Sequence, residues 1–146
     1  MNNQSFCERR HQTLKLAQEL LDKRDKVWAL HGHLIKLKPD SEEQALEPLV
    51  RQFCQELIDY ISLEHFGIFH HLLGGNEQRR SILVLADEIF PQMVETTDIA
   101  LDFNDKCEAL SPAFLQFELP GELVILRDAL ARRVELEDVL IEAMTS

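Results

Sequence analysis

The chain has 146 residues, of which 45% are hydrophobic and 28% are charged, and its formal net charge is −11. This length fits one ordinary domain (residues 1–146), and the composition excludes an intrinsically disordered chain. Five glycines and five prolines leave little material for the turns of a β fold. The apolar runs are interrupted too often for a membrane span, and the N-terminal stretch lacks the apolar region of a signal peptide.

The three cysteines indicate the compartment. Cys7, Cys54 and Cys107 are odd in number, far apart and free of any CxxC pair. This pattern argues against a disulfide or zinc framework and predicts reduced thiols in a cytoplasmic protein.

The charge is distributed unevenly. Residues 1–38 hold eight basic and four acidic side chains. Between Ile82 and Leu126, Lys106 alone opposes nine acidic residues: Asp87, Glu88, Glu95, Asp98, Asp102, Asp105, Glu108, Glu118 and Glu122. Such a surface repels nucleic acid and anionic lipid, and it suits a basic protein partner, for which a DNA-binding domain is the commonest kind. The alternative is that the acidic surface only maintains solubility.

Apolar periodicity predicts helices along the whole chain. The first covers about residues 8–37, and Asp40 or Ser41 can cap a second over about 42–62. A short third segment, about 63–73, stops at Gly74-Gly75-Asn76. The sequence leaves open whether the chain continues, bends or restarts between the second and third segments.

Two further helices are expected beyond that stop. One runs from about residue 77 to 107, and Pro91 should kink it or mark a new first turn. Residues 109–119 read as a loop that packs onto the bundle, and Pro120 opens a last helix to about residue 143. We therefore predict an all-α, antiparallel up-and-down four-helix bundle with an additional short helix.

Each helix has an apolar stripe that we expect to form the core. The inward residues are Leu14, Leu20, Leu21, Val27, Trp28, Leu34 and Ile35; Leu46, Leu49, Val50, Phe53, Leu57, Tyr60 and Ile61; Ile82, Leu85, Ala86, Ile89, Met93, Ala100 and Leu101; and Leu123, Leu126, Leu130, Val134, Ile141 and Met144.

The second helix carries an unusual set of residues on its other side. At about 100° per residue, the outward stripe reads Gln52, Gln55, Asp59, Ser62 and Phe66. A purely solvated face would not be expected to end in phenylalanine. A carboxylate, a hydroxyl and an aromatic ring in one row are typical of a surface that binds a partner.

An enzymatic or metal-binding role finds little support. A di-iron bundle needs two Glu-x-x-His motifs and two further glutamates, and only Glu8-Arg9-Arg10-His11 fits. His70 and His71 are expected at the surface or half buried, where a helix C-terminus favours the imidazolium form. Phosphate loops, GxSxG and HExxH motifs are absent from the sequence. We expect no catalytic residues, metal or cofactor.

A histidine phosphotransfer bundle is the alternative function. His31-Gly32-His33-Leu34-Ile35-Lys36 is its candidate segment, because Lys36 could steady a phosphoryl group on His33. Such domains usually need a small residue at the next position, which here is Leu37. Two ordinary histidines on a helix face explain the segment more simply.

Four segments of the chain stand out as motifs. The most distinctive comprises Phe53-Cys54-Gln55, Leu57, Asp59-Tyr60, Ser62, His65-Phe66 and Ile68. The others are Leu20-Leu21-Asp22-Lys23-Arg24, Ile89-Phe90-Pro91-Gln92 and Val134-Glu135-Leu136-Glu137-Asp138-Val139-Leu140-Ile141. In matching order, these segments resemble the Rsd/AlgQ family, the bacterial regulators of sigma D. The resemblance covers about residues 16–142 without 109–119. Leu20 replaces the family's usual tryptophan, and the segment between the first two helices differs in length.

The resemblance implies a non-enzymatic anti-sigma factor. Relatives bind the C-terminal domain of the primary sigma factor, a basic helix-turn-helix module that reads the promoter −35 element. This binding competes with DNA and core polymerase and favours alternative sigma factors in stationary phase. Some relatives are also linked to the sugar-phosphotransferase phosphocarrier protein, a second candidate partner.

Carried onto this chain, the resemblance makes Asp59 the partner of a sigma arginine. Ser62 becomes a hydrogen-bonding position that allows close backbone approach, and Phe66 becomes the apolar anchor. Two simpler readings stand beside these roles. Asp59 could form an intrahelical salt bridge or be a solvated carboxylate. Phe66 could turn into the core if the helix bends at Ser62.

Overall fold

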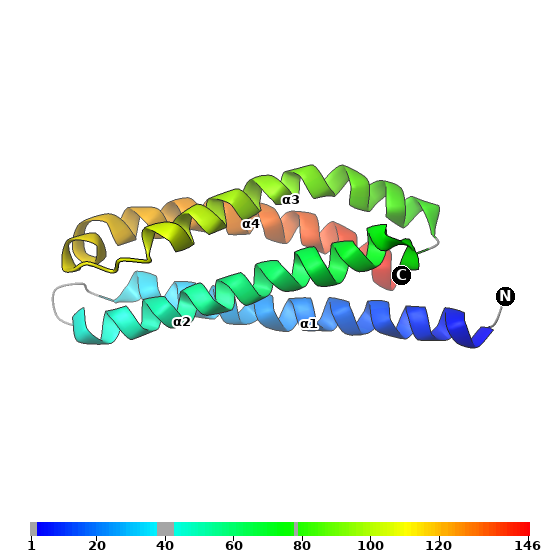
Figure 1. Cartoon of the computed structure of the whole chain (residues 1–146), viewed down its shortest axis with the longest axis horizontal. Helices are drawn as coiled ribbons and strands as arrows, with labels where there is room; N and C mark the ends of the chain where they lie inside the picture. The colour runs from blue at the N-terminus through cyan, green and yellow to red at the C-terminus, as the bar shows by residue number, and fades with distance from the viewer. Residues whose placement is uncertain (1–2, 38–42, 78) are drawn as a thin grey trace.

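The computed structural model describes residues 3–37, 43–77 and 79–146, and within them it shows four long helices and no strand. These are α1 (Asn3–Lys36), α2 (Glu43–Ser62), α3 (Arg80–Lys106) and α4 (Leu119–Thr145). Successive helices run in opposite directions, and the ends of α1 and α4 nearest the two termini lie at the same end of an elongated bundle (Figure 1). The predicted all-α, up-and-down four-helix bundle is confirmed.

The chain does not bend or restart after Ser62. Ser62 has helical angles (φ −64°, ψ −41°), and the helix continues through the π-helical segment η1 (Leu63–Phe69) and then η2 (Leu72–Asn76). It ends where Gly75 adopts φ 94°, a left-handed conformation that glycine tolerates at no steric cost. The additional short helix is therefore an extension of α2.

Of the loop that the sequence predicts over residues 109–119, only 109–111 are non-helical, and helix begins at Pro112. A third π-helical segment, η3 (Phe114–Glu118), leads directly into α4. Leu110, Phe114, Leu115 and Leu119 are buried, so the predicted packing of this stretch onto the bundle is confirmed. Pro91 lies inside α3 and does not begin a new helix.

The predicted core is largely correct. Val50, Phe53, Leu57 and Tyr60 of α2 are fully enclosed at 0% exposure. The prediction of burial is wrong for three residues: Leu14, Ile35 and Leu101 are 40%, 46% and 41% exposed. Their neighbours on the same helices take the inward positions, because each helix buries a narrower stripe than the sequence reading assumed.

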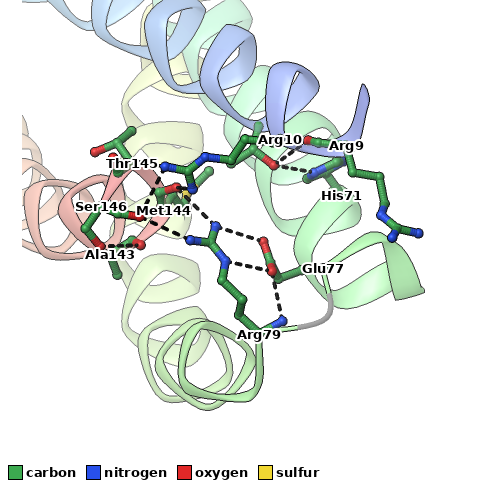
Figure 2. Close-up of polar contacts among 10 residues, drawn as sticks. Arg9, Arg10, His71, Glu77, Arg79, Ala143, Met144, Thr145 and Ser146 are labelled. Carbon is green, nitrogen blue, oxygen red and sulfur yellow. Dashed lines mark hydrogen bonds and ion pairs between the residues drawn. The ribbon is translucent and has the colours of Figure 1, made fainter. Parts of the chain in front are cut away.

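Two arginines close the end of the bundle where α4 terminates (Figure 2). Arg10 Nη1 donates to the Met144 carbonyl at 2.9 Å, and Arg79 Nη2 donates to the same carbonyl at 3.1 Å. Glu77 holds Arg79 by an ion pair of 3.1 Å from Nε to Oε1. The last carbonyls of a helix lack intrahelical donors and carry partial negative charge, so guanidinium groups stabilise this end.

The four helices do not include a membrane-crossing segment. Within the described ranges, none is both long enough and apolar enough to span a bilayer.

Candidate partner-binding surface

The predicted outward stripe lies on the outer face of α2 and η1. Gln52, Gln55 and Phe66 are exposed, while Asp59 and Ser62 are half-buried. Gln55 Nε2 donates a hydrogen bond of 3.0 Å to Asp59 Oδ1. This bond fixes one oxygen of the carboxylate, and the other remains available to a donor outside the chain.

Phe66 is directed away from the core. Its side chain is 70% exposed, so the reading that turned this ring inward is wrong. The His65 ring packs edge-on against it, with centroids 4.8 Å apart and planes at 86°. His65 in turn lies 5.8 Å from the Phe90 ring of α3. One edge of Phe66 is thus supported, and most of the ring faces solvent.

Gly67 explains how η1 approaches α1 at this point. A Cβ at position 67 would lie 3.0 Å from Leu63 Cδ1 and 3.4 Å from Leu16 Cδ2. A Cβ there would therefore crowd the Leu63 side chain and would only touch Leu16. The π-helical geometry, which is rare and frequent at functional sites, spans all the residues from Leu63 to Phe69 and so includes Phe66.

A buried polar layer lies directly behind this surface. Glu64, Arg133 and Glu137 are each at most 2% exposed. Arg133 Nε is 3.4 Å from Glu137 Oε2 and 3.6 Å from Glu64 Oε2. The Tyr60 hydroxyl donates to Glu137 Oε2, and the Arg133 guanidinium lies 5.3 Å from the centre of the Tyr60 ring.

The other helices complete this polar layer. From α1, Arg24 Nη1 contacts Glu137 Oε1 at 3.4 Å and Asp138 Oδ1 at 2.8 Å. From α3, the Thr96 hydroxyl accepts a hydrogen bond of 3.0 Å from Arg133 Nη1. A buried charge is tolerated only when it is paired and hydrogen-bonded, so these contacts tie all four helices together.

Burial raises the pKa of Glu64 well above its ordinary value, and the nearby Glu137 adds to the shift while Arg133 opposes it. A protonated Glu64 leaves the layer neutral, because Arg24 and Arg133 are then balanced by Glu137 and Asp138. Burial likewise raises the pKa of Tyr60, so its hydroxyl remains a donor.

Sequence reasoning missed this layer, although a signal was present. Arg133 and Glu137 continue the spacing of Leu126, Leu130 and Leu140, alternating four and three residues apart. The apolar pattern predicts Val134 and Ile141 as the inward residues of these turns, and both are only partly buried. Polar residues at heptad core positions were the available clue.

The two histidines of the phosphotransfer candidate segment differ in exposure. His31 is 2% exposed, and its Nε2 lies 2.8 Å from the Leu123 carbonyl; burial lowers its pKa. His33 is exposed on α1. Across the described part of the chain, no three His, Cys, Asp or Glu residues group as metal ligands.

His71 corrects one expectation. It is buried, its Nε2 lies 2.9 Å from the Thr13 hydroxyl, and burial lowers its pKa (Figure 2). The imidazolium form that we expected beside the helix C-terminus is therefore disfavoured. His70 is exposed, as predicted.

The acidic stretch between Ile82 and Leu126 lies mainly along α3. Asp87, Glu88, Glu95, Asp98 and Asp102 are exposed there. The lone basic residue of this stretch is already paired: Lys106 Nζ lies 3.1 Å from both Asp102 Oδ2 and Glu122 Oε1. The exposed face of α3 is thus negative.

Comparison with known proteins agrees with this picture. The model of the family described as regulator of RNA polymerase sigma(70) subunit, Rsd/AlgQ, matches residues 1–145. The chain belongs to the Rsd/AlgQ family.

Relatives include the "Regulator of sigma D" proteins of Salmonella paratyphi A (strain ATCC 9150 / SARB42) and Salmonella newport (strain SL254). Each is 31% identical over 144 residues, covering 94% of this chain and 86% of the relative. No solved structure matches the chain. The Rsd/AlgQ match extends beyond residues 16–142 and includes the segment 109–119 that the motifs left out.

Proposed function

We propose that this chain is an anti-sigma factor that binds the C-terminal domain of the primary sigma factor through Asp59, Ser62 and Phe66. One observation carries the proposal. Phe66 is 70% exposed, in line with a hydroxyl and a carboxylate, in a member of the Rsd/AlgQ family. Single exposed apolar side chains are common, but an aromatic ring in a row with polar groups has the composition of a binding hot spot.

Each residue has a chemical role in the proposed contact. Asp59, held by Gln55 on one oxygen, accepts hydrogen bonds from an arginine of the sigma domain. Ser62 contributes a hydroxyl and little bulk, which allows the partner backbone to approach. Phe66 inserts into an apolar pocket of the partner, and removing such an anchor commonly costs about 2 kcal/mol or more.

The acidic surface of α3 supports the choice of a basic partner. A helix-turn-helix domain presents arginines and lysines that otherwise contact DNA phosphates. Carboxylates such as Asp98 and Asp102 can attract these groups and speed the encounter. A sigma domain held in this way contacts neither promoter DNA nor core RNA polymerase, which leaves polymerase to alternative sigma factors in stationary phase.

The rest of the proposal follows from the same role. The protein forms one domain, acts in the cytoplasm and works by protein–protein contact, with no reaction catalysed and no direct contact with nucleic acid or membrane. The sugar-phosphotransferase phosphocarrier protein is proposed as a second partner. The phosphotransfer alternative keeps one observation in its favour, because His33 is exposed on α1, while Leu37 stands where such domains usually need a small residue.

A pull-down tests the proposal. Immobilised protein should retain the purified C-terminal domain of the primary sigma factor at low salt, and it should retain less as salt rises. The matching domain of an alternative sigma factor, which is also basic, is the specificity control and should pass through. Failure to retain the primary sigma domain at low salt would overturn the proposal. If retention did not change with salt concentration, charge attraction between the acidic surface and the sigma domain would not contribute to binding.

A further inference from the structure

Two cysteines that lie 53 positions apart in the sequence meet at a hollow between α2 and the end of α3. The hollow has a volume of about 420 Å³. Its lining residues come from both segments: Arg51, Cys54, Gln55 and Ile58, and Asn104, Asp105, Cys107, Glu108 and Leu110. Because most of these are polar, water and small polar solutes can enter.

The two thiols contact each other. Both cysteines are free, Cys54 is half-buried, and Cys107 is 3% exposed. The Cys107 thiol is hydrogen-bonded to the Cys54 sulfur. To form a disulfide, the two sulfurs must move from this contact to about 2 Å.

Their surroundings give the two sulfurs different reactivity. The hydrogen bond from Cys107 lowers the pKa of Cys54, and the positive charge of Arg51 acts in the same direction. The same bond, together with burial, raises the pKa of Cys107. The thiolate is the reactive form of cysteine, so Cys54 is the attacking group and Cys107 the group that resolves the product.

We propose that Cys54 and Cys107 form a peroxide-reactive dithiol that closes reversibly into a disulfide linking α2 to the end of α3. The hollow is the entry for a small peroxide. In a reducing compartment such a bond is transient and responds to oxidants. The proposal does not depend on the identity of the binding partner.

The reaction balances with hydrogen peroxide as oxidant. The Cys54 thiolate attacks one peroxide oxygen, the O–O bond breaks, and hydroxide leaves to take up the thiol proton as water. Cys54 is then a sulfenic acid. The Cys107 sulfur attacks the Cys54 sulfur, the S–S bond forms, the S–O bond breaks, and a second water carries away the Cys107 proton. Two thiols and one peroxide give one disulfide and two waters.

The test uses the folded protein with Cys7→Ser, which removes the exposed third thiol. Brief treatment with hydrogen peroxide should abolish both remaining thiols in a thiol titration and lower the intact mass by two hydrogen atoms. Peptide mapping should recover the segments around Cys54 and Cys107 as one cross-linked species. Dithiothreitol should restore both thiols. A mass increase by added oxygen, a covalent dimer, or two thiols that persist would each overturn the proposal.

Two single variants test the assigned roles. Cys107→Ser should trap Cys54 as a sulfenic acid that dimedone labels, because the resolving sulfur is gone. Cys54→Ser should leave Cys107 unlabelled and reduced, because the thiol is enclosed. Equal labelling of both variants would contradict the division of roles. Since the mass measurement is made without either substitution, a variant that failed to fold would leave the main result standing.

Discussion

Residues 59–66 carry two very different surfaces on the same turns of one helix. Asp59, Ser62 and Phe66 face outward, whereas Tyr60 and Glu64 point into a layer closed by Arg133 and Glu137. On the outward side, polar and aromatic groups are left accessible and cost the fold little. On the inward side, every charge depends on a neighbour from another helix. The comparison separates residues suited to binding from residues suited to folding.

The largest effect should come from the inward side. Arg133→Met removes the guanidinium that faces Glu64 and Glu137 but keeps an apolar side chain in its place. We expect the free energy of unfolding to fall by about 3–5 kcal/mol, because buried carboxyl groups lose their partner. Urea unfolding measures the loss.

Arg132→Met is the matched control for this change. Arg132 is the neighbouring residue, but its side chain is 52% exposed and pairs with an exposed Glu135. Its loss should cost between about 0 and 1 kcal/mol. Equal destabilisation by the two changes would contradict the role given to the buried layer.

A smaller effect on stability should depend on pH. Glu64 keeps its proton in the folded protein to a higher pH than in the unfolded chain, because burial raises its pKa. Below the ordinary pKa of a glutamate both states are protonated, and the group has no effect. Above it, the unfolded state binds fewer protons, so this group lowers stability as pH rises towards its folded pKa.

Glu64→Gln should remove this penalty. Its stability relative to wild type should grow with pH above the ordinary glutamate pKa, by up to about 1.4 kcal/mol per pH unit. Thermal melts at several pH values measure the difference, and Glu95→Gln on the exposed face of α3 is the control. A constant difference between Glu64→Gln and wild type would show that Glu64 is ionised in the fold.

The smallest effect belongs to the outward carboxylate. Asp59→Asn removes the charge but keeps an oxygen that can accept the hydrogen bond from Gln55. Sigma-domain binding should weaken about tenfold, or about 1.4 kcal/mol, while the melting temperature stays unchanged. Titration calorimetry measures the affinity. Asp128→Asn, an exposed aspartate on α4, should leave the affinity at the wild-type value. An equal loss of affinity in Asp128→Asn would show that Asp59 acts only through the net charge of the protein and not through a specific contact.

Much of the outward surface could be predicted from the sequence, because helical phase alone places Asp59, Ser62 and Phe66 on one side. The prediction for Phe66 depended on a helix continuing through Ser62, and the π-helical segment satisfies that condition. The π-helical form itself was not predicted, because no residue pattern in Leu63–Phe69 distinguishes it from an α-helix.

The inward layer was harder to predict. Periodicity methods look for apolar residues, so Arg133, Glu137 and Glu64 were overlooked although they occupy core positions. Residues 109–119 were predicted as a loop that ends where Pro120 opens the last helix, yet helical structure already begins at Pro112, because proline is compatible with the first turn of a helix. The meeting of Cys54 and Cys107 depends on the packing of α2 against the end of α3, which sequence spacing cannot reveal.

The central claim is that the outward face binds the partner and contributes little to folding. Phe66 and Phe117 offer a direct test, since they are 70% and 75% exposed and lie in two different π-helical segments, η1 and η3. The measurement is the affinity for the primary sigma C-terminal domain, taken with the urea midpoint, for wild type, Phe66→Ala and Phe117→Ala. We predict that Phe66→Ala loses about 2 kcal/mol or more of binding with an unchanged midpoint, and that Phe117→Ala binds as wild type. Equal affinities for the two variants, or a large fall in midpoint for Phe66→Ala, would contradict the account.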